Sequence, residues 1–237
     1  MTTIDVDVPF SVANRAVYVP DADALVVADA HLGRAAASAV DAPIADGSDV
    51  LARLEDALER FDPATVVVAG DLLHSFSRVP RGVSESVADL EAAVSRTGAS
   101  LVVTPGNHDT MLEDVYDGET TADYRLSDDE TVVTHGHERP DLEARRYVIG
   151  HVHPALSIDG RKRPCLLYGP DTYEGADVVV VPAITRLASG MTVNTVSGRD
   201  IHSPLVTAID DFHPVVRDPD SEESLWFPPL GACRHLL

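Results

Sequence analysis

The stretch Gly106-Asn107-His108-Asp109 follows the apolar run Ser100–Thr104, from which Pro105 separates it. A run rich in β-branched residues that stops at Pro-Gly is typical of a buried strand that ends in a loop. Asn107 offers a neutral carbonyl oxygen as a ligand, and His108 offers a titratable imidazole beside it. By itself the tetrapeptide is also compatible with an ordinary turn, because Asn, Gly and Asp are common turn residues.

Four further apolar runs end in residue types that bind metals. These runs lead to Asp29/His31, Asp71, His135 and His151/His153. In open α/β sheets, ligands bind in the crevice beyond the carboxyl ends of the strands, so these side chains are expected to meet. Within Asp29/His31 and His151/His153, the i, i+2 spacing places both side chains on one side of an extended chain. The repetition favours a shared site over independent turns.

The chemistry of these side chains predicts two metal ions. Carboxylates, imidazoles and an amide oxygen, without thiolates, suit Mn, Fe, Co, Ni or Zn. Because about seven such ligands exceed the need of a single ion, a dinuclear site is expected, with one carboxylate as a bridge. In such a site a water shared by the two ions becomes the nucleophile.

The apolar pattern predicts an α/β fold with two stacked sheets flanked by helices. Amphipathic helices are expected over residues 50–61 and 83–97, between strand-like runs. Later strand-like runs lack long helices between them, which favours antiparallel pairing in a second sheet: Pro164–Tyr168, Val178–Val181, Met191–Val196 and Leu205–Ile209. Glu113–Asp129 is expected to be surface loop, and Leu142–Arg146 a short helix. The expected organisation is one domain, 1–237, with a C-terminal tail from about residue 212 packed on it.

The formal net charge of −21 is extreme for 237 residues, and Lys162 is the only lysine. Dispersed acid with few lysines resembles proteins of salt-in halophiles, so we expect a halophilic, archaeal source. The charge is therefore more informative about the solvent than about the ligand. It argues against a broad basic groove for nucleic acid. It leaves open nucleic acid or a nucleotide at a metal site, where the ions supply positive charge.

Several features favour a cytoplasmic protein without a membrane span. No apolar stretch reaches the length of a transmembrane helix, and the N-terminus lacks the pattern of a signal peptide. Two cysteines, Cys165 and Cys233, are too few for a disulfide framework and are expected to be reduced. Nothing in the pattern specifies an oligomeric state.

The order of these motifs resembles the calcineurin-like metallophosphoesterases, whose pattern is D-x-H, G-D, G-N-H-D, H and G-H-x-H. The resemblance runs from Asp29 to His153. It implies a four-layer αββα sandwich in which Asp71 bridges two ions. The resemblance divides the other ligands between a first and a second metal: Asp29, His31 and His153 for the first, and Asn107, His135 and His151 for the second.

The same resemblance assigns roles around the metals. His108 would contact the phosphate and protonate the leaving oxygen, and Asp109 would orient His108 by accepting from its other ring nitrogen. His137 is expected near the site but not as a ligand. Arg34 and His74 could reach a phosphate or the groups that surround the ligands, or could simply be surface residues at helix starts.

The runs Asp29–Arg34 and Gly70–His74 resemble one small branch of the family. That branch comprises archaeal ICC-type phosphoesterases and bacterial metallophosphoesterases found beside DNA ligase genes. The branch implies a phosphodiester substrate related to nucleotides or nucleic acid. Manganese is the expected metal, with Fe, Zn, Ni or Co as alternatives. The other interpretations are a phosphomonoesterase or protein phosphatase, and a non-catalytic scaffold such as the family's retromer subunit.

Overall fold

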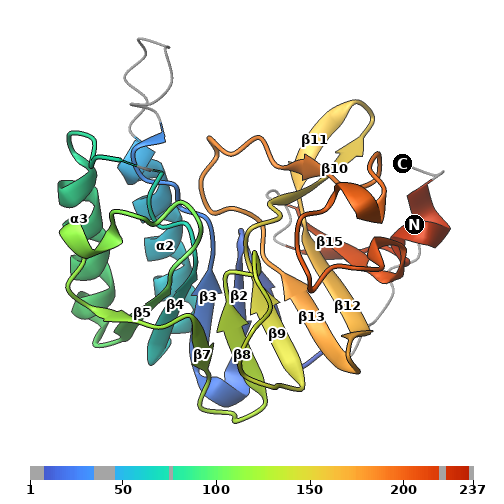
Figure 1. Ribbon diagram of the computed structural model, residues 1–237, viewed down its shortest axis with the longest axis horizontal. Helices are drawn as coiled ribbons and strands as arrows, with labels where there is room; N and C mark the ends of the chain where they lie inside the picture. The colour runs from blue at the N-terminus through green and yellow to red at the C-terminus, as the bar shows by residue number, and fades with distance from the viewer. Residues whose placement is uncertain (1–7, 35–45, 75–76, 219–222, 235–237) are drawn as a thin grey trace.

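The computed structural model describes residues 8–34, 46–74, 77–218 and 223–234 (Figure 1). The first sheet has six strands in the order β1-β2-β3-β4-β5-β6. Their bounds are Ser11–Ala13, Ala16–Val19, Ala24–Val27, Thr65–Ala69, Ser100–Thr104 and Glu119–Thr120. β3, β4 and β5 run parallel, with Val26 opposite Val67 and Val67 opposite Val102. Their carboxyl ends therefore lie at one edge of the sheet.

Two helices, α2 (Asp46–Phe61) and α3 (Val83–Thr97), cover the outer face of this sheet (Figure 1). Val50, Leu54 and Leu58 repeat at helical spacing along α2 and are buried. α3 ends at Gly98, whose φ of 86° is left-handed and unstrained for glycine. Both helices were expected from the sequence, and they shield the strands that lead to the predicted ligands.

The second sheet has seven strands in the order β16-β15-β12-β13-β9-β8-β7. From β7 to β16 their bounds are Asp123–Arg125, Thr131–Thr134, Arg146–Ile149, Leu166–Tyr173, Ala176–Val180, His213–Arg217 and Ser224–Trp226. β8, β9 and β13 run parallel, whereas β12, β15 and β16 pair antiparallel. A smaller sheet, β11-β10-β14, contains Arg161–Pro164, Pro154–Ile158 and Met191–Thr192.

The two large sheets stack on a shared apolar layer. Val26 and Val67 of the first sheet meet Val133, Val148 and Val179 of the second in one buried cluster. Mixed sheets flanked by helices confirm the expected α/β fold class. The described helices are too short or too polar to span a bilayer.

The outer face of the second sheet is covered mainly by loops and short elements. Leu156 of β10, Leu205, Phe212 and Leu230 are buried there in one cluster. The described helices on this side are short: η3 (Gly198–Asp200), η4 (Ile209–Asp211) and α4 (Leu230–Cys233). The fourth layer of the sandwich therefore contains far less helix than the first.

Several local predictions were wrong. Leu142–Arg146 does not form the expected helix: this segment has bends at residues 142 and 145, and Arg146 begins β9. The Tyr147 hydroxyl donates to the Leu142 carbonyl. Leu205–Ile209 is not a strand, because its apolar side chains are buried in a turn that needs no ladder partner. Only Met191–Thr192 of the run 191–196 forms a strand, and Glu113–Asp129 contains β6 and β7.

Candidate metal centre

The predicted ligands follow five strands at facing edges of the two sheets. β3, β4 and β5 lead to Asp29/His31, Asp71 and Asn107, and β8 and β9 lead to His135 and His151/His153. Backbone hydrogen bonds join the loops that follow β3 and β4: the Asp29 amide donates to the Gly70 carbonyl, and the His31 amide donates to the Asp71 carbonyl, at 3.0 and 2.9 Å. The stacking of the sheets thus brings all of these side chains to one place.

The backbone of five of these residues is left-handed. The residues are Asp29, His31, Asp71, His151 and His153, with φ between 47° and 64°. Such values are uncommon outside glycine and cluster at functional sites. The i, i+2 pairs do share a site, but through left-handed turns and not through the extended chain that the spacing suggested.

A first group of side chains surrounds a space the size of one ion. The ligand atoms of Asp29, His31, Asp71 and His153 all lie within 4.8 Å of one another. His153 Nε2 lies 3.2 Å from His31 Nε2 and 3.1 Å from Asp29 Oδ1. In a coordination shell with bonds of about 2.1 Å, neighbouring ligand atoms are about 3 Å apart. The spacing fits a metal.

A second group lies on the other side of Asp71. His135 Nε2 is 3.3 Å from Asn107 Oδ1 and 3.2 Å from His151 Nδ1. Asp71 reaches both groups, since its Oδ1 is 3.6 Å from His135 Nε2 and its Oδ2 is 3.8 Å from His31 Nε2. One carboxylate thus presents an oxygen to each group.

Burial sets the charge state of the site. It lowers the pKa of His31 to about 3 and that of His135 to about 4, so both rings are neutral at pH 7 and keep a lone pair for a metal. Burial, followed by the charge of Asp29, raises the pKa of Asp71 to about 8. Two carboxylates only 0% and 2% exposed are costly to ionise side by side, and a bound cation would relieve that cost.

The other ring nitrogens of two predicted ligands face backbone carbonyls. His135 Nδ1 lies 3.2 Å from the Ala69 carbonyl, and His151 Nε2 lies 3.0 Å from the His202 carbonyl. A proton on each of these nitrogens leaves His135 Nε2 and His151 Nδ1 as the metal-facing atoms, as is usual in metal sites. His202 was missed from the sequence, because a backbone carbonyl on a distant loop has no motif.

Two further histidines lie beside the first group. His74 stacks on His108 with centroids 5.0 Å apart and rings 17° from parallel, and both meet the edge of His31. Burial, then His74, then the positive charge of Arg34 lower the pKa of His108. Arg34 is therefore close enough to influence His108. His137 lies beside the second group, 5.0 Å from the His135 ring.

The carboxylate of Asp109 contacts backbone amides. It accepts from the amides of Leu72, Leu73 and Gly106, at 3.2, 2.8 and 2.9 Å. These bonds tie the loop after β5 to the loop after β4, so Asp109 stabilises the loop that contains Asp71. The expected orientation of His108 by Asp109 stays a prediction.

Replacing Gly70 by Ala is expected to disrupt the second group. Gly70 has a φ of 75°, and a Cβ there would clash with the His135 ring at Nδ1. Displacing a site residue by an ångström can cost about 100-fold in rate. Gly98→Ala is the matched control, because Gly98 has a φ of 86° and nothing within 4 Å of a new Cβ. Metal content and turnover should fall in Gly70→Ala alone; an equal loss in both variants would contradict the argument.

Comparisons with known proteins identify the family of the chain. The model of the calcineurin-like phosphoesterase family matches residues 23–155, which include every predicted ligand. The solved nuclease MPE of Pseudomonas putida shares 22% identity over 86% of this chain and 88% of that chain, with a TM-score of 0.59. YfcE, a phosphoesterase from E. coli, shares 14% identity over 87% and 98% of the two chains, with a TM-score of 0.43. The search of curated proteins gives no significant match. Since the family match covers more than half of the sequence, the chain belongs to the calcineurin-like phosphoesterase family.

Proposed function

We propose that the protein is a dinuclear, metal-dependent phosphoesterase. The supporting observation is the placement of the Asp71 carboxylate between two groups of neutral or anionic ligand atoms. Asp29, His31 and His153 would hold one divalent ion, and Asn107, His135 and His151 the other. The two ions, when bound, would activate a water molecule and stabilise the oxygens of an in-line displacement at phosphorus.

The chain's own residues would supply binding and proton transfer. His108 would donate a proton to the leaving oxygen, a contribution of typically about 10²–10⁴-fold. The negative charge of a bound phosphate favours the protonated imidazole and offsets the lowered pKa of His108. Arg34 and His74 would contact the phosphate from the same side, since both interact with His108.

The preferred substrate is a phosphodiester related to nucleotides or nucleic acid. Support comes from the resemblance of Asp29–Arg34 and Gly70–His74 to the ICC-type and ligase-associated branch, and from the nuclease name of the P. putida neighbour. Manganese is the proposed metal. We also propose a halophilic archaeal source, supported by the acidic composition, and the cytoplasm as the place of action, supported by the low cysteine content. We also propose that residues 1–237 form one domain, with the C-terminal tail from about residue 212 packed on it.

Metal analysis and two nitrophenyl esters test the proposal. We expect close to two ions per chain and faster hydrolysis of bis-(p-nitrophenyl) phosphate than of p-nitrophenyl phosphate, in high salt with Mn²⁺. Removing the metals with a chelator should abolish turnover and lower Tm, because ligands that bind only the folded state stabilise it. Faster hydrolysis of the monoester would favour a phosphomonoesterase. No hydrolysis of either ester with two ions bound would favour a scaffold.

A further inference from the structure

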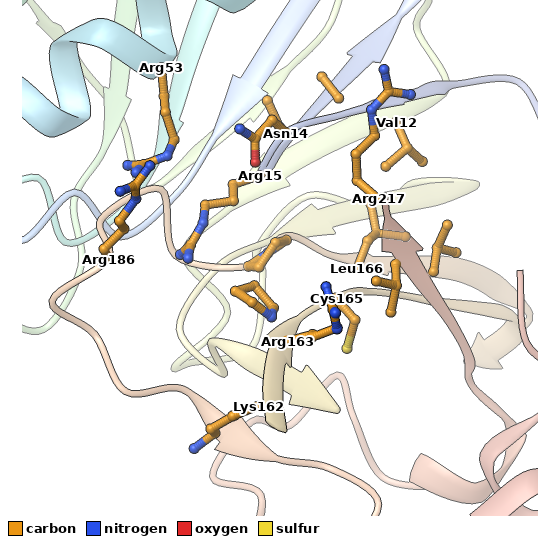
Figure 2. A pocket seen from close by; sticks show the side chains of 16 residues that line it. Val12, Asn14, Arg15, Arg53, Lys162, Arg163, Cys165, Leu166, Arg186 and Arg217 are labelled. Carbon is orange, nitrogen blue, oxygen red and sulfur yellow. The ribbon is translucent and has the colours of Figure 1, made fainter. Parts of the chain in front are cut away.

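A cleft lined by cationic side chains lies beside the metal centre. Figure 2 shows its main cavity, of about 320 Å³, between the β1–β2 turn, β11 and β15. We call it the cationic cleft, after its six basic lining residues: Arg15, Arg53, Lys162, Arg163, Arg186 and Arg217. A second cavity of about 170 Å³ shares Arg15, Lys162 and Arg186 with the first and is also lined by His153. The cationic cleft thus extends to a residue of the metal centre.

The charge of the cationic cleft is opposite to that of the whole chain. It gathers six of the 18 basic residues of a protein whose net charge is −21. Within the described part of the chain, no acidic side chain lines either cavity. Asp49 compensates part of the charge from outside, 2.7 Å from Arg53 and 3.4 Å from Arg186. Arg15, Lys162 and Arg163 contribute further positive charge.

Two of the arginines are fixed by the fold. Arg15 donates to the carbonyls of Ala183 and Thr185 at 2.7 and 2.8 Å, and Arg53 donates to the carbonyl of Ile184 at 2.8 Å. Carbonyl oxygens accept hydrogen bonds without neutralising the charge. Burial, then the neighbouring Arg53, lower the pKa of Arg15 to about 10, which still leaves it charged at pH 7. Arg53 also pairs with Asp49, so the fixed positive charge that the structure builds into the cleft is mainly that of Arg15.

The outer cations reach solvent. Arg186 is 73% exposed, and Lys162 and Arg163 on β11 are exposed as well. Arginine presents a planar fork of donors that matches phosphate oxygens, and lysine adds a point charge. This combination of a fixed charged wall and accessible donors is suited to phosphate groups.

We propose that the cationic cleft binds phosphates of a nucleic-acid strand whose reacting phosphodiester lies at the metal centre. The inference rests on the proposed function and extends it, since it makes an oligonucleotide a better substrate than a diester with a single phosphate. The two cavities share lining residues, and the second is also lined by His153, which favours the phosphates of one strand over a separate anion. The net charge of −21 argues against a broad basic groove. Net charge does not specify where cations lie, so it could not predict that basic residues from distant segments line one cavity.

Binding of a labelled single-stranded oligonucleotide tests the cleft. The metal-loaded protein carries His108→Ala, so that the oligonucleotide is not hydrolysed during the measurement. Binding is measured by fluorescence anisotropy of the labelled oligonucleotide at several salt concentrations. Adding Arg163→Gln and Arg186→Gln should lower the binding constant about tenfold. The slope of log binding constant against log salt concentration should become less steep by about 0.7 for each phosphate that the variant no longer neutralises. Arg145→Gln is the control, because exposed Arg145 precedes β9 at the end of that strand opposite the ligands. Equal binding by the cleft variant and the control would overturn the proposal.

Kinetics and a small anion separate the remaining outcomes. In the otherwise unmodified enzyme, the two cleft substitutions should raise KM for the oligonucleotide about tenfold and change turnover of bis-(p-nitrophenyl) phosphate by less than about twofold. If calorimetry shows that the substitutions abolish binding of inorganic phosphate while oligonucleotide binding is unchanged, the cleft holds a free anion and the proposal is wrong. Failure to hydrolyse either nitrophenyl ester would overturn the proposed function alone, since the binding comparison does not depend on turnover.

Discussion

Asp71→Asn is expected to leave no more than one metal per chain and to lower kcat/KM for a phosphodiester by about 10³-fold or more. Asparagine has the same size, but its amide offers one acceptor oxygen and an NH2 group that cannot bind a cation. In the native chain, Oδ1 faces His135 while Oδ2 faces His31, so both oxygens are needed to join the two groups. Metal stoichiometry by elemental mass spectrometry and steady-state kinetics check the prediction.

The stability of the metal-free Asp71→Asn variant gives an independent readout. Burial beside Asp29 raises the pKa of Asp71 to about 8, so the folded state binds more protons than the unfolded state between the two pKa values. Ionised Asp71 therefore destabilises the metal-free fold as the pH rises toward 8. The variant should be at least as stable without metal at pH 7, yet should gain less Tm from added Mn²⁺. Asp200→Asn, at an exposed helix cap, is the control. Full metal content in Asp71→Asn would show that Asp71 does not bridge.

The convergence of these side chains could be predicted because strand ends and ligand types coincide in sequence. Each β-branched run is a buried strand, covered by the other sheet on one face and by helices or by loops and short elements on the other, and the polar ligand types begin where the strand ends. The sequence could not reveal that Asp29, His31 and Asp71 adopt left-handed backbones, because neither pattern nor composition specifies φ at a strand end. Nor could it reveal that Asp109 contacts backbone amides of another loop, since those amides carry no sequence identity.

The distribution of charge was the hardest property to predict. Arg15, Arg53, Arg163 and Arg217 are separated by long stretches of acidic chain, and each could equally offset nearby carboxylates. Their convergence depends on how β11 and β15 lie against the β1–β2 turn, which is a property of the fold.

The apolar run Leu205–Ile209 resembles a strand because periodicity reports burial without specifying a hydrogen-bond partner.

His108→Ala is expected to lower kcat by about 10²–10⁴-fold while both metals remain bound. The backbone amide of His108 donates to Asp71 Oδ1 at 2.9 Å, and alanine keeps that bond. Only the imidazole, which stacks on His74 and meets the edge of His31, is removed. Metal stoichiometry and single-turnover kinetics on a dinucleotide, whose alkoxide leaving group needs a proton, are the measurements. Loss of metal together with activity would make the role of His108 structural.

The leaving group distinguishes proton donation from positioning. Nitrophenolate is a stable anion that departs with little need of a proton, whereas the alkoxide of an alkyl diester must be protonated as it leaves. The cost of His108→Ala should therefore be larger for a dinucleotide than for the nitrophenyl diester. His202→Ala is the matched control, because its backbone carbonyl, which faces His151, is retained and its exposed imidazole is not assigned a role. An equal loss for both leaving groups would mean that His108 contacts the phosphate without acting as the acid.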